Sequence, residues 1–203
     1  MIIIIDYGMG NLRSVYNKFK RLGITCVVSS KKEDIESAEK LVLPGVGHFK
    51  YGMENLIKLG LIDTLNNKVI EQKTPIFGIC LGTQLFCSYS EEGNCKGLGW
   101  LDAEVVKFRV SDTLKYKVPH MGWNDVNVKN SNFIDKVIDS TDKFYFVHSY
   151  HLKCNDEADV WMTSEYDYKF VSAVHRDNIY GTQFHPEKSH DVGYELLKKF
   201  AEM

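Results

Sequence analysis

The sequence has no excess of basic residues. Its 203 residues include 25 Lys and Arg against 27 Asp and Glu, which gives a formal net charge of −2. A protein that neutralises a phosphate backbone needs clustered lysines and arginines in excess. Nucleic acid is therefore not an expected partner.

The sequence also lacks a long hydrophobic run. Its N-terminal apolar run, residues 2–5, ends at Asp6 and has no basic residue before it. A membrane span needs about 20 apolar residues, and the apolar part of a signal peptide needs about 7–15. We therefore expect this run to be a strand of a cytoplasmic protein that does not associate with membranes.

Paired cysteines are absent as well. The chain has five cysteines, an odd number, and no C-x-x-C pair, which argues against both a disulfide framework and a structural zinc site. His148 and His151 are the closest histidines, but an offset of three in one extended strand would place them on opposite faces. We expect a reducing compartment, no bound metal and no cofactor.

The length and the order of the patterns predict one α/β domain spanning residues 1–203. A chain of this length can bury about 70% of the surface that it exposes when unfolded. Short apolar runs alternate with helical patterns in the first half, with strands expected at 2–5, 26–28, 41–43 and 75–79, and helices at 12–22, 35–38, 56–69 and from 81 to 88. Asn11 is placed as the cap of the first helix and Gly23 as its end. This alternation predicts right-handed crossovers and a mostly parallel sheet.

The pattern changes after about residue 97. Strand-like runs separated by polar turns follow, among them 145–150, 160–162 and 170–174, and they are typical of antiparallel ribbons. A closing helix is expected at 190–200. No repeat, linker or low-complexity tract interrupts the chain.

The sharpest chemical signal is the pentapeptide Gly78-Ile79-Cys80-Leu81-Gly82, a G-x-C-x-G at the junction of a strand and a helix. It has the form of a nucleophile elbow with Cys in place of Ser. Small neighbours permit the tight turn, and the turn points Cys80 outward above the carboxyl edge of the sheet. The N-terminus of the helix behind it favours the reactive thiolate.

A thiolate nucleophile works with a base that also protonates the leaving group and with a carboxylate that orients the base. His185-Pro186-Glu187 supplies both groups within three residues. Proline holds the residue before it out of the helical region, so we expect this segment to be extended, with His185 and Glu187 on one side. The sequence cannot show whether this segment meets Cys80.

Other chemistry-bearing residues have plainer interpretations. We interpret five further histidines as structural or surface residues: His48, His120, His148, His175 and His190. Gly8-Met9-Gly10 is half of a dinucleotide fingerprint, but Arg13 stands at the third glycine position, which favours a tight loop over NAD binding. The pairs Glu91-Glu92 and Lys198-Lys199 are expected on solvated faces.

Five motifs together resemble the class I glutamine amidotransferases, and more narrowly the branch of glutaminase subunits of imidazole glycerol phosphate synthases. They are PGVGHF (44–49), GICLGTQLF (78–86), PHMGWN (119–124), FVHSYH (146–151) and GTQFHPEKS (181–189). The resemblance covers nearly the whole chain. It implies a flavodoxin-like three-layer α/β/α domain with a mostly parallel central sheet, antiparallel strands in the C-terminal half, and the site at the carboxyl edge.

The resemblance also implies roles for individual residues. Cys80 is the nucleophile, His185 the general base and acid, and Glu187 the group that orients it. The oxyanion hole is expected from the backbone N–H of Leu81 together with one from the loop of Val46 and Gly47. The remaining substrate-binding positions are Gly47, Gln84, Ser149 and Tyr150.

Ammonia released at such a site is useful only while it is unprotonated. The resemblance therefore implies a heterodimer in which ammonia passes to a cyclase subunit with a β/α-barrel fold. The positions that match the surface facing that subunit are Asn11, Met121, Trp123, Tyr145 and Lys188. An ordinary core tryptophan is the competing interpretation of Trp123.

Two departures from the branch keep alternatives open. Thr83 stands where Met is expected, and Cys87-Ser88-Tyr89 replaces a more acidic segment. A paralogous glutaminase that supplies ammonia for amidation of a sugar is therefore a second hypothesis. A catalytically idle regulatory or scaffold subunit is a third, although such a subunit has no chemical need for Cys80, His185 and Glu187 together.

Overall fold

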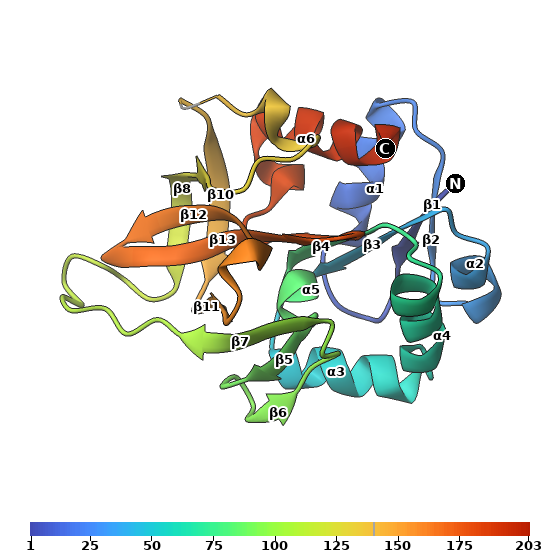
Figure 1. Ribbon diagram of the computed structural model, residues 1–203, viewed down its shortest axis with the longest axis horizontal. Helices are drawn as coiled ribbons and strands as arrows, with labels where there is room; N and C mark the ends of the chain where they lie inside the picture. The colour runs from blue at the N-terminus through green and yellow to red at the C-terminus, as the bar shows by residue number, and fades with distance from the viewer. Residues whose placement is uncertain (140) are drawn as a thin grey trace.

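The computed structural model describes residues 1–139 and 141–203. A twisted sheet runs through the molecule and carries helices on both faces of its parallel half (Figure 1). That half has the strand order β2-β1-β3-β4-β14, and every neighbouring pair in it is parallel. Its strands are β1 (Ile2–Ile5), β2 (Cys26–Ser29), β3 (Lys40–Gly45), β4 (Ile76–Cys80) and β14 (Ile179–Thr182).

Three of the parallel strands are buried along their whole length because both faces of the sheet are covered. All residues of β1, β4 and β14 are buried, as expected for strands between two helical layers. Within β1, Ile3 and Ile5 belong to the core on one face, and Ile2 and Ile4 belong to the core on the other. The predicted strands of the first half are confirmed.

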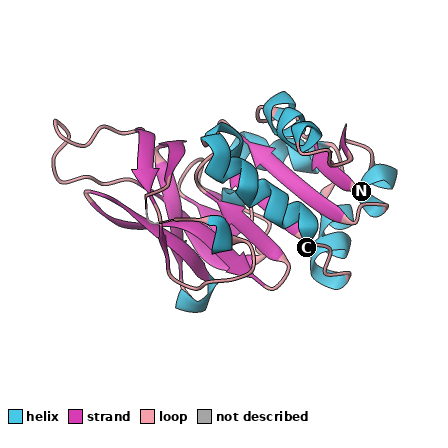
Figure 2. Ribbon diagram, turned by 90° about the horizontal axis from the view of Figure 1, so that it is seen from above, coloured by secondary structure: helices cyan, strands magenta, loops and turns pink. Residues whose placement is uncertain are grey.

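Two helical layers enclose this sheet (Figure 2). On one face lie α1 (Leu12–Arg21) and α6 (His190–Glu202), and on the other lie α2 (Lys32–Glu36), α3 (Phe49–Lys58), α4 (Ile62–Asn66), the π-helical turn η1 (Asn67–Glu71) and α5 (Leu81–Gln84). The Asn11 side chain accepts from the Ser14 N–H at the start of α1, and Gly23 follows its end with a φ of +72°. The predicted three-layer α/β fold is confirmed.

The second half of the chain extends the sheet with mostly antiparallel strands. From β14 the order continues through β13, β11, β7, β5 and β6, with β12 on β13 and β9 on β12. Their bounds are β5 (Cys87–Ser90), β6 (Cys95–Lys96), β7 (Leu101–Lys107), β9 (Asn127–Val128), β11 (Tyr150–Cys154), β12 (Val160–Tyr166) and β13 (Tyr168–Arg176). The described residues also form three short 3-10 turns: η2 (Asp135–Val137), η3 (Glu157–Asp159) and η4 (Pro186–Lys188).

A separate antiparallel ribbon stands beside this sheet, formed by β8 (His120–Asp125) and β10 (Lys143–His148). The side chains of β10 alternate, with Phe144, Phe146 and His148 buried. The predicted single strand over 145–150 is wrong in one respect. The chain leaves the ribbon at Ser149, and Tyr150 begins β11 in the main sheet.

One predicted helix is shorter than the pattern indicates, and another is displaced. The helix expected from 81 to 88 ends at Gln84, because the backbone groups that follow pair with a distant segment. The Leu98 and Trp100 N–H groups donate to the Leu85 and Phe86 carbonyls. The helix expected at 35–38 is α2, which begins earlier, at Lys32, and ends at Glu36, so that Ala38 is buried beyond it. None of the described helices is long and apolar enough to span a membrane.

Candidate active site

The G-x-C-x-G segment forms a sharp turn between β4 and α5. Cys80 ends the strand with a φ of +54°, a conformation that costs a residue with a side chain about 1–3 kcal/mol. A Cβ on Gly82 would overlap the carbonyl oxygen of Leu43, and one on Gly78 would lie 2.6 Å from the Phe86 ring. The two glycines therefore permit the turn that places Cys80 at the carboxyl edge of the parallel strands.

His185 and Glu187 form a buried pair beside this turn. The Nδ1 of His185 lies 2.8 Å from Oε1 of Glu187, and both side chains are almost completely buried. The prediction that the whole segment is extended is wrong, because Pro186–Lys188 forms the 3-10 turn η4, with His185 extended before it. The turn still brings the two side chains together.

The main chain of His185 is fixed by the neighbouring ribbon. Its N–H donates to the Tyr145 carbonyl, and its carbonyl accepts from the Ser189 hydroxyl at 2.6 Å. The same hydroxyl accepts from the Tyr145 N–H at 3.0 Å. Strand β10 therefore holds the His185 backbone from both sides.

The electrostatics link Cys80 to this pair. Burial would lower the pKa of His185, but the adjacent Cys80 and Glu187 raise it to about 10. The imidazole is therefore positively charged at neutral pH. Its Nε2 is the ring nitrogen not bonded to Glu187, so a Cys80 thiolate and a His185 imidazolium can stabilise each other.

Cys80 opens into a cleft of about 190 Å³. Drug-sized ligands occupy sites of roughly 300–1,000 Å³, so this cleft suits a smaller molecule such as an amino acid. Seven positions expected at the site line it together: Val46, Gly47, Cys80, Leu81, Gln84, Ser149 and Tyr150. Three remote segments of the chain therefore meet at the nucleophile.

Gln84 lies at the centre of a buried amide network. Its Nε2 donates to the Tyr150 carbonyl at 3.1 Å and to Oε1 of Gln183 at 3.0 Å. The Nε2 of Gln183 in turn donates to the Cys80 sulfur at 3.6 Å. The sequence interpretation missed Gln183, although it lies two residues before His185 in an extended segment, and such residues share a face.

Glu92 also lines the cleft, which contradicts its interpretation as part of a solvated face. One of its carboxylate oxygens accepts from the Phe49 N–H at 2.8 Å. This bond draws the half-buried side chain inward to the start of α3. Its neighbour Glu91 does face solvent, where it pairs with Arg109. A carboxylate at the cleft wall can hold the ammonium group of an amino acid.

The hydroxyl of Tyr7, near Cys80, is also buried. Burial and then the nearby Cys80 raise the pKa of Tyr7. Its oxygen lies against Gly45, where any Cβ would overlap it, and it has no hydrogen-bond partner among the described residues. Tyr7 therefore supports the backbone on which the cleft is built.

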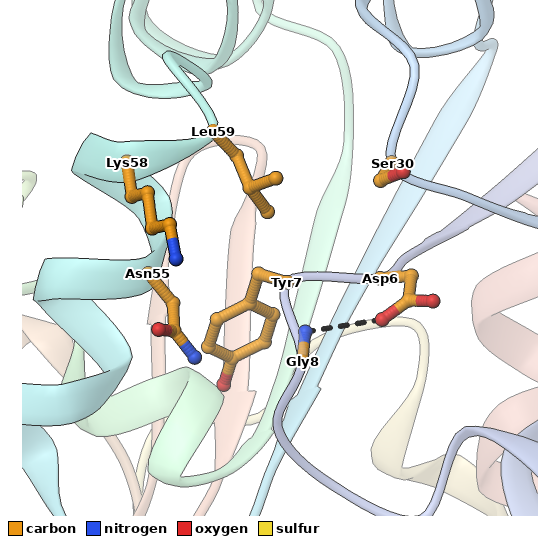
Figure 3. Close-up of a pocket in the computed structure, with 7 residues that line it drawn as sticks. All are labelled: Asp6, Tyr7, Gly8, Ser30, Asn55, Lys58 and Leu59. Carbon is orange, nitrogen blue, oxygen red and sulfur yellow. Dashed lines mark hydrogen bonds between the residues drawn. The ribbon is translucent and has the colours of Figure 1, made fainter.

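Tyr7 also lines a second hollow, of about 320 Å³, which Cys80 does not line (Figure 3). Figure 3 shows the Tyr7 hydroxyl pointing away from Ser30 and Leu59, which line the opposite side. Asp6 and Lys58 give this hollow one charge of each sign. None of the residues predicted to be catalytic lines it.

Three histidines gather around Phe108 behind the cleft. Nδ1 of His120 lies 3.0 Å from Nε2 of His148, and the His148 and His151 rings lie 5.2 and 4.6 Å from the Phe108 ring. The expectation that His148 and His151 occupy opposite faces is wrong, because they lie on different strands that approach one aromatic ring. Burial lowers the pKa of all three, that of His120 to about 4. His148 also reaches the cleft wall.

No group of three or more potential metal ligands occurs among residues 1–139 and 141–203. The five cysteines all have free thiols.

An exposed apolar surface lies on the outer side of the ribbon, and we call it the Trp123 face. Met121 and Trp123 are 66% and 43% exposed, so Trp123 is not a core residue. Trp123 stacks on His190 and lies opposite Tyr145, whose ring is covered by the Lys188 ammonium. Four of the five positions expected to face a partner therefore lie together. The fifth, Asn11, is exposed at the start of α1, and α1 packs against η4.

The residues that depart from the expected motifs have structural roles. Thr83 is fully buried and its hydroxyl donates to the Thr182 carbonyl at 2.9 Å. Its methyl and hydroxyl groups pack against Gly181, where a Cβ would collide with them. Cys87, Ser88 and Tyr89 begin β5, and the Ser88 hydroxyl donates to the Leu101 carbonyl. None of these four residues lines the cleft.

Comparison with known proteins gives a consistent result. The family model for glutamine amidotransferase class-I matches residues 3–203. The chain is 51% identical over 200 residues to the imidazole glycerol phosphate synthase subunit HisH 2 of Methanococcus maripaludis, with 98% of each chain covered. It is 48% identical over 203 residues to the subunit of the same name from Pseudomonas aeruginosa, with both chains fully covered.

Solved structures share the fold at lower identity. A crystal structure titled glutamine amidotransferase superposes with a TM-score of 0.76 at 20% identity, covering all of both chains. The structure of PurLQS from Thermotoga maritima gives a TM-score of 0.72 at 18% identity, covering 99% of this chain and 97% of that one.

Proposed function

Because the chain belongs to the class I glutamine amidotransferase family, we propose that it is the glutaminase subunit of an imidazole glycerol phosphate synthase. It hydrolyses L-glutamine to glutamate and ammonia for histidine biosynthesis. The observation that carries this proposal is the cysteine elbow beside the buried His185–Glu187 pair, in a chain that is 51% identical to a protein named for this synthase.

Cys80, His185 and Glu187 form the proposed catalytic triad. The Cys80 thiolate attacks the side-chain amide carbon of glutamine, and the His185 imidazolium gives its proton to the departing ammonia. His185 then accepts a proton from the water that hydrolyses the thioester. Glu187 holds Nδ1 of the ring, so that Nε2 faces the reacting groups.

Residues of the cleft wall are proposed to stabilise the oxyanion and to bind glutamine. The N–H groups of Leu81 and of the Val46 and Gly47 loop are the proposed oxyanion donors. Gln84, Ser149 and Tyr150 are the proposed contacts for glutamine, and we add Glu92 as the partner of its ammonium group. All of them line the same cleft, and its size suits an amino acid.

The proposed partner is a cyclase subunit with a β/α-barrel fold, bound as a heterodimer. Large exposed aromatic residues are typical of interfaces, and the Trp123 face offers Trp123 and Tyr145 beside the His185 segment. Asn11, Met121 and Lys188 complete the proposed contact. The five free thiols fit an enzyme of the cytoplasm.

The test is glutamate release from glutamine by the purified chain, alone and with the histidine-pathway cyclase and its nucleotide substrate. We expect low activity alone, strong stimulation by the loaded cyclase, and complete loss in Cys80→Ala with the fold retained. Activity that depends on Cys80 but is not stimulated would favour a glutaminase that supplies another acceptor, such as a sugar-amidating enzyme. No activity under any condition would favour an idle subunit.

A further inference from the structure

The Gln183 side chain lies at the nucleophile, although none of the expected roles uses it. It follows β14, and its side chain is completely buried. Its own N–H donates to the Ser172 carbonyl at 2.8 Å, which fixes its backbone to β13. Its side-chain Nε2 lies 3.6 Å from the Cys80 sulfur.

The surrounding network determines which end of the Gln183 amide faces the sulfur. The Tyr150 carbonyl can only accept a hydrogen bond, so the Gln84 group that faces it must be the NH₂. The second hydrogen of that NH₂ goes to Gln183, which must present its oxygen. The NH₂ of Gln183 is then left facing Cys80. Reversing either amide would place two acceptors or two donors against each other.

The energetics of this contact depend on the charge of the sulfur. A thiol sulfur is a weak acceptor, whereas a hydrogen bond to a charged group is roughly twice as strong as a neutral one. A buried amide N–H without a good partner is costly. A Cys80 thiolate therefore offsets the free-energy cost of burying the Gln183 N–H better than a thiol does. As a result, the contact favours the ionised form of Cys80.

We propose that Gln183 is a further catalytic residue, whose side-chain amide donates a hydrogen bond to the Cys80 thiolate and stabilises it for attack. Gln84 orients this donor and connects it to the Tyr150 segment of the cleft wall. The proposal rests on the proposed function for its catalytic meaning, but the contact with the thiolate can be tested without glutamine.

The test measures the rate at which iodoacetamide alkylates Cys80 as a function of pH, with the modified peptide followed by mass spectrometry. Gln183→Met keeps an unbranched chain of similar length and removes the donor. Gln183→Glu keeps the acceptor for Gln84 and replaces the donor by an oxygen. We expect the midpoint of the alkylation profile to rise by about one to two pH units in both variants, and most in Gln183→Glu.

The same variants should lose about 10- to 100-fold in kcat/KM for glutamine below the wild-type midpoint and recover part of it at high pH. A residue that only fills space would lower activity equally at every pH. The other titratable groups around Cys80 are unchanged in these variants: Tyr7, Glu92, His148, His185 and Glu187.

Thr182→Val is the matched control. Thr182 is the buried neighbour of Gln183, and its hydroxyl donates to the Phe184 carbonyl. The variant removes a buried hydrogen bond from the same segment without touching the sulfur. Its alkylation midpoint should equal that of the wild type.

An unchanged midpoint in both Gln183 variants would overturn the proposal. If neither variant folds, an NMR titration of the wild-type chain provides the test. The side-chain NH₂ resonances of Gln183 should shift as Cys80 titrates, and the same shift should be absent in Cys80→Ala. Resonances that do not move would equally overturn it. A shifted midpoint in a chain that never hydrolyses glutamine would retain the contact and reject the proposed function.

Discussion

The side chains of Cys80 and His185 are coupled through their charges. Both are buried, and a buried charge is stable only beside an opposite charge or strong hydrogen bonds. The imidazolium of His185 has Glu187 on one side and Cys80 on the other. The reactive state of the site is therefore a property of this group of side chains and not of the cysteine alone.

Cys80→Ala should lower the pKa of His185 from about 10. Burial lowers this pKa, and the variant removes one of the two groups that oppose burial. NMR titration of the His185 ring measures the change. Cys26→Ala, on the edge strand β2, should leave the pKa unchanged. An unaltered pKa in Cys80→Ala would mean that Glu187 alone sustains the imidazolium.

Thr83→Val should destabilise the protein by about 1 kcal/mol, because it removes a buried hydrogen bond to the Thr182 carbonyl while nearly keeping the shape. Urea unfolding measures the free energy. The exposed Thr113→Val provides the control and should change it by less than about 0.5 kcal/mol. Equal effects of the two variants would contradict a structural role for the Thr83 hydroxyl.

At the scale of elements, the site depends on how closely α5 approaches the sheet. Glycines at 45, 78, 82 and 181 allow this approach, since a Cβ at each would collide with the turn, its helix or a neighbouring strand. Strand β10 performs the corresponding task for His185 by holding its backbone through Tyr145 and Ser189.

Gly82→Ala should therefore cost about 3 kcal/mol or more, because its Cβ would overlap the Leu43 carbonyl in a rigid strand. Thermal and urea unfolding, together with glutaminase activity, measure the effect. Gly23→Ala is matched to it as a control, since Gly23 has a positive φ but no atom near its Cβ position. That variant should cost only about 1–2 kcal/mol. A Gly82→Ala protein of normal stability would show that α5 can move away from β3.

At the scale of the whole molecule, the two halves of the sheet contribute different parts of the site. The parallel half supplies the nucleophile and the His185 segment at its carboxyl edge. The antiparallel half and the ribbon supply one wall of the cleft, the histidines behind it and the Trp123 face. A partner that covers the Trp123 face would therefore contact the ribbon that holds His185.

Trp123→Ala should weaken binding to the proposed cyclase subunit by about 2 kcal/mol, or roughly 30-fold in Kd, because large aromatic side chains often dominate the binding energy of an interface. Titration calorimetry measures the affinity. Phe133→Ala is the control, since Phe133 is 52% exposed and contacts Lys199 near the C-terminal end of α6. Trp123 instead stacks on His190, at the N-terminal end of that helix. Equal losses in the two variants would place the interface elsewhere.

The buried histidines predict how global stability depends on pH. Burial holds the pKa of His120 at about 4 and that of His148 also below its usual value near 6.5. The unfolded chain therefore binds more protons than the folded one between about pH 6.5 and pH 4, so the stability that these residues contribute above pH 6.5 is lost as the pH falls.

Urea unfolding between pH 7 and pH 4 should show this decline, with a slope of at most about 1.4 kcal/mol per pH unit for each histidine. His120→Gln removes one titrating group and should flatten the curve, provided that the variant folds. A curve for His120→Gln parallel to that of the wild type would show that other groups cause the decline.

Local sequence patterns were sufficient to predict the helices and strands that depend mainly on residues close to one another in the chain. The continuous apolar runs of β1 and β4 predicted buried parallel strands, and Asn11 and Gly23 predicted the two ends of α1. The spacing of Gly78, Cys80 and Gly82 predicted the elbow, because the motif itself lies within five consecutive residues, although the contact that requires Gly82 is with the distant Leu43 carbonyl. The motifs indicated the family because the residues of each motif lie in one short contiguous segment, which can be read without the tertiary structure.

Tertiary structure decided what depends on distant partners. Long-range hydrogen bonds ended α5 at Gln84 and divided residues 146–151 between two strands. Gln183 contacts Cys80, and Glu92 accepts from the Phe49 N–H, although both partners are far away in the chain. Sequence spacing predicts which residues share a face of one element, but which side chains meet across elements depends on how the whole chain packs.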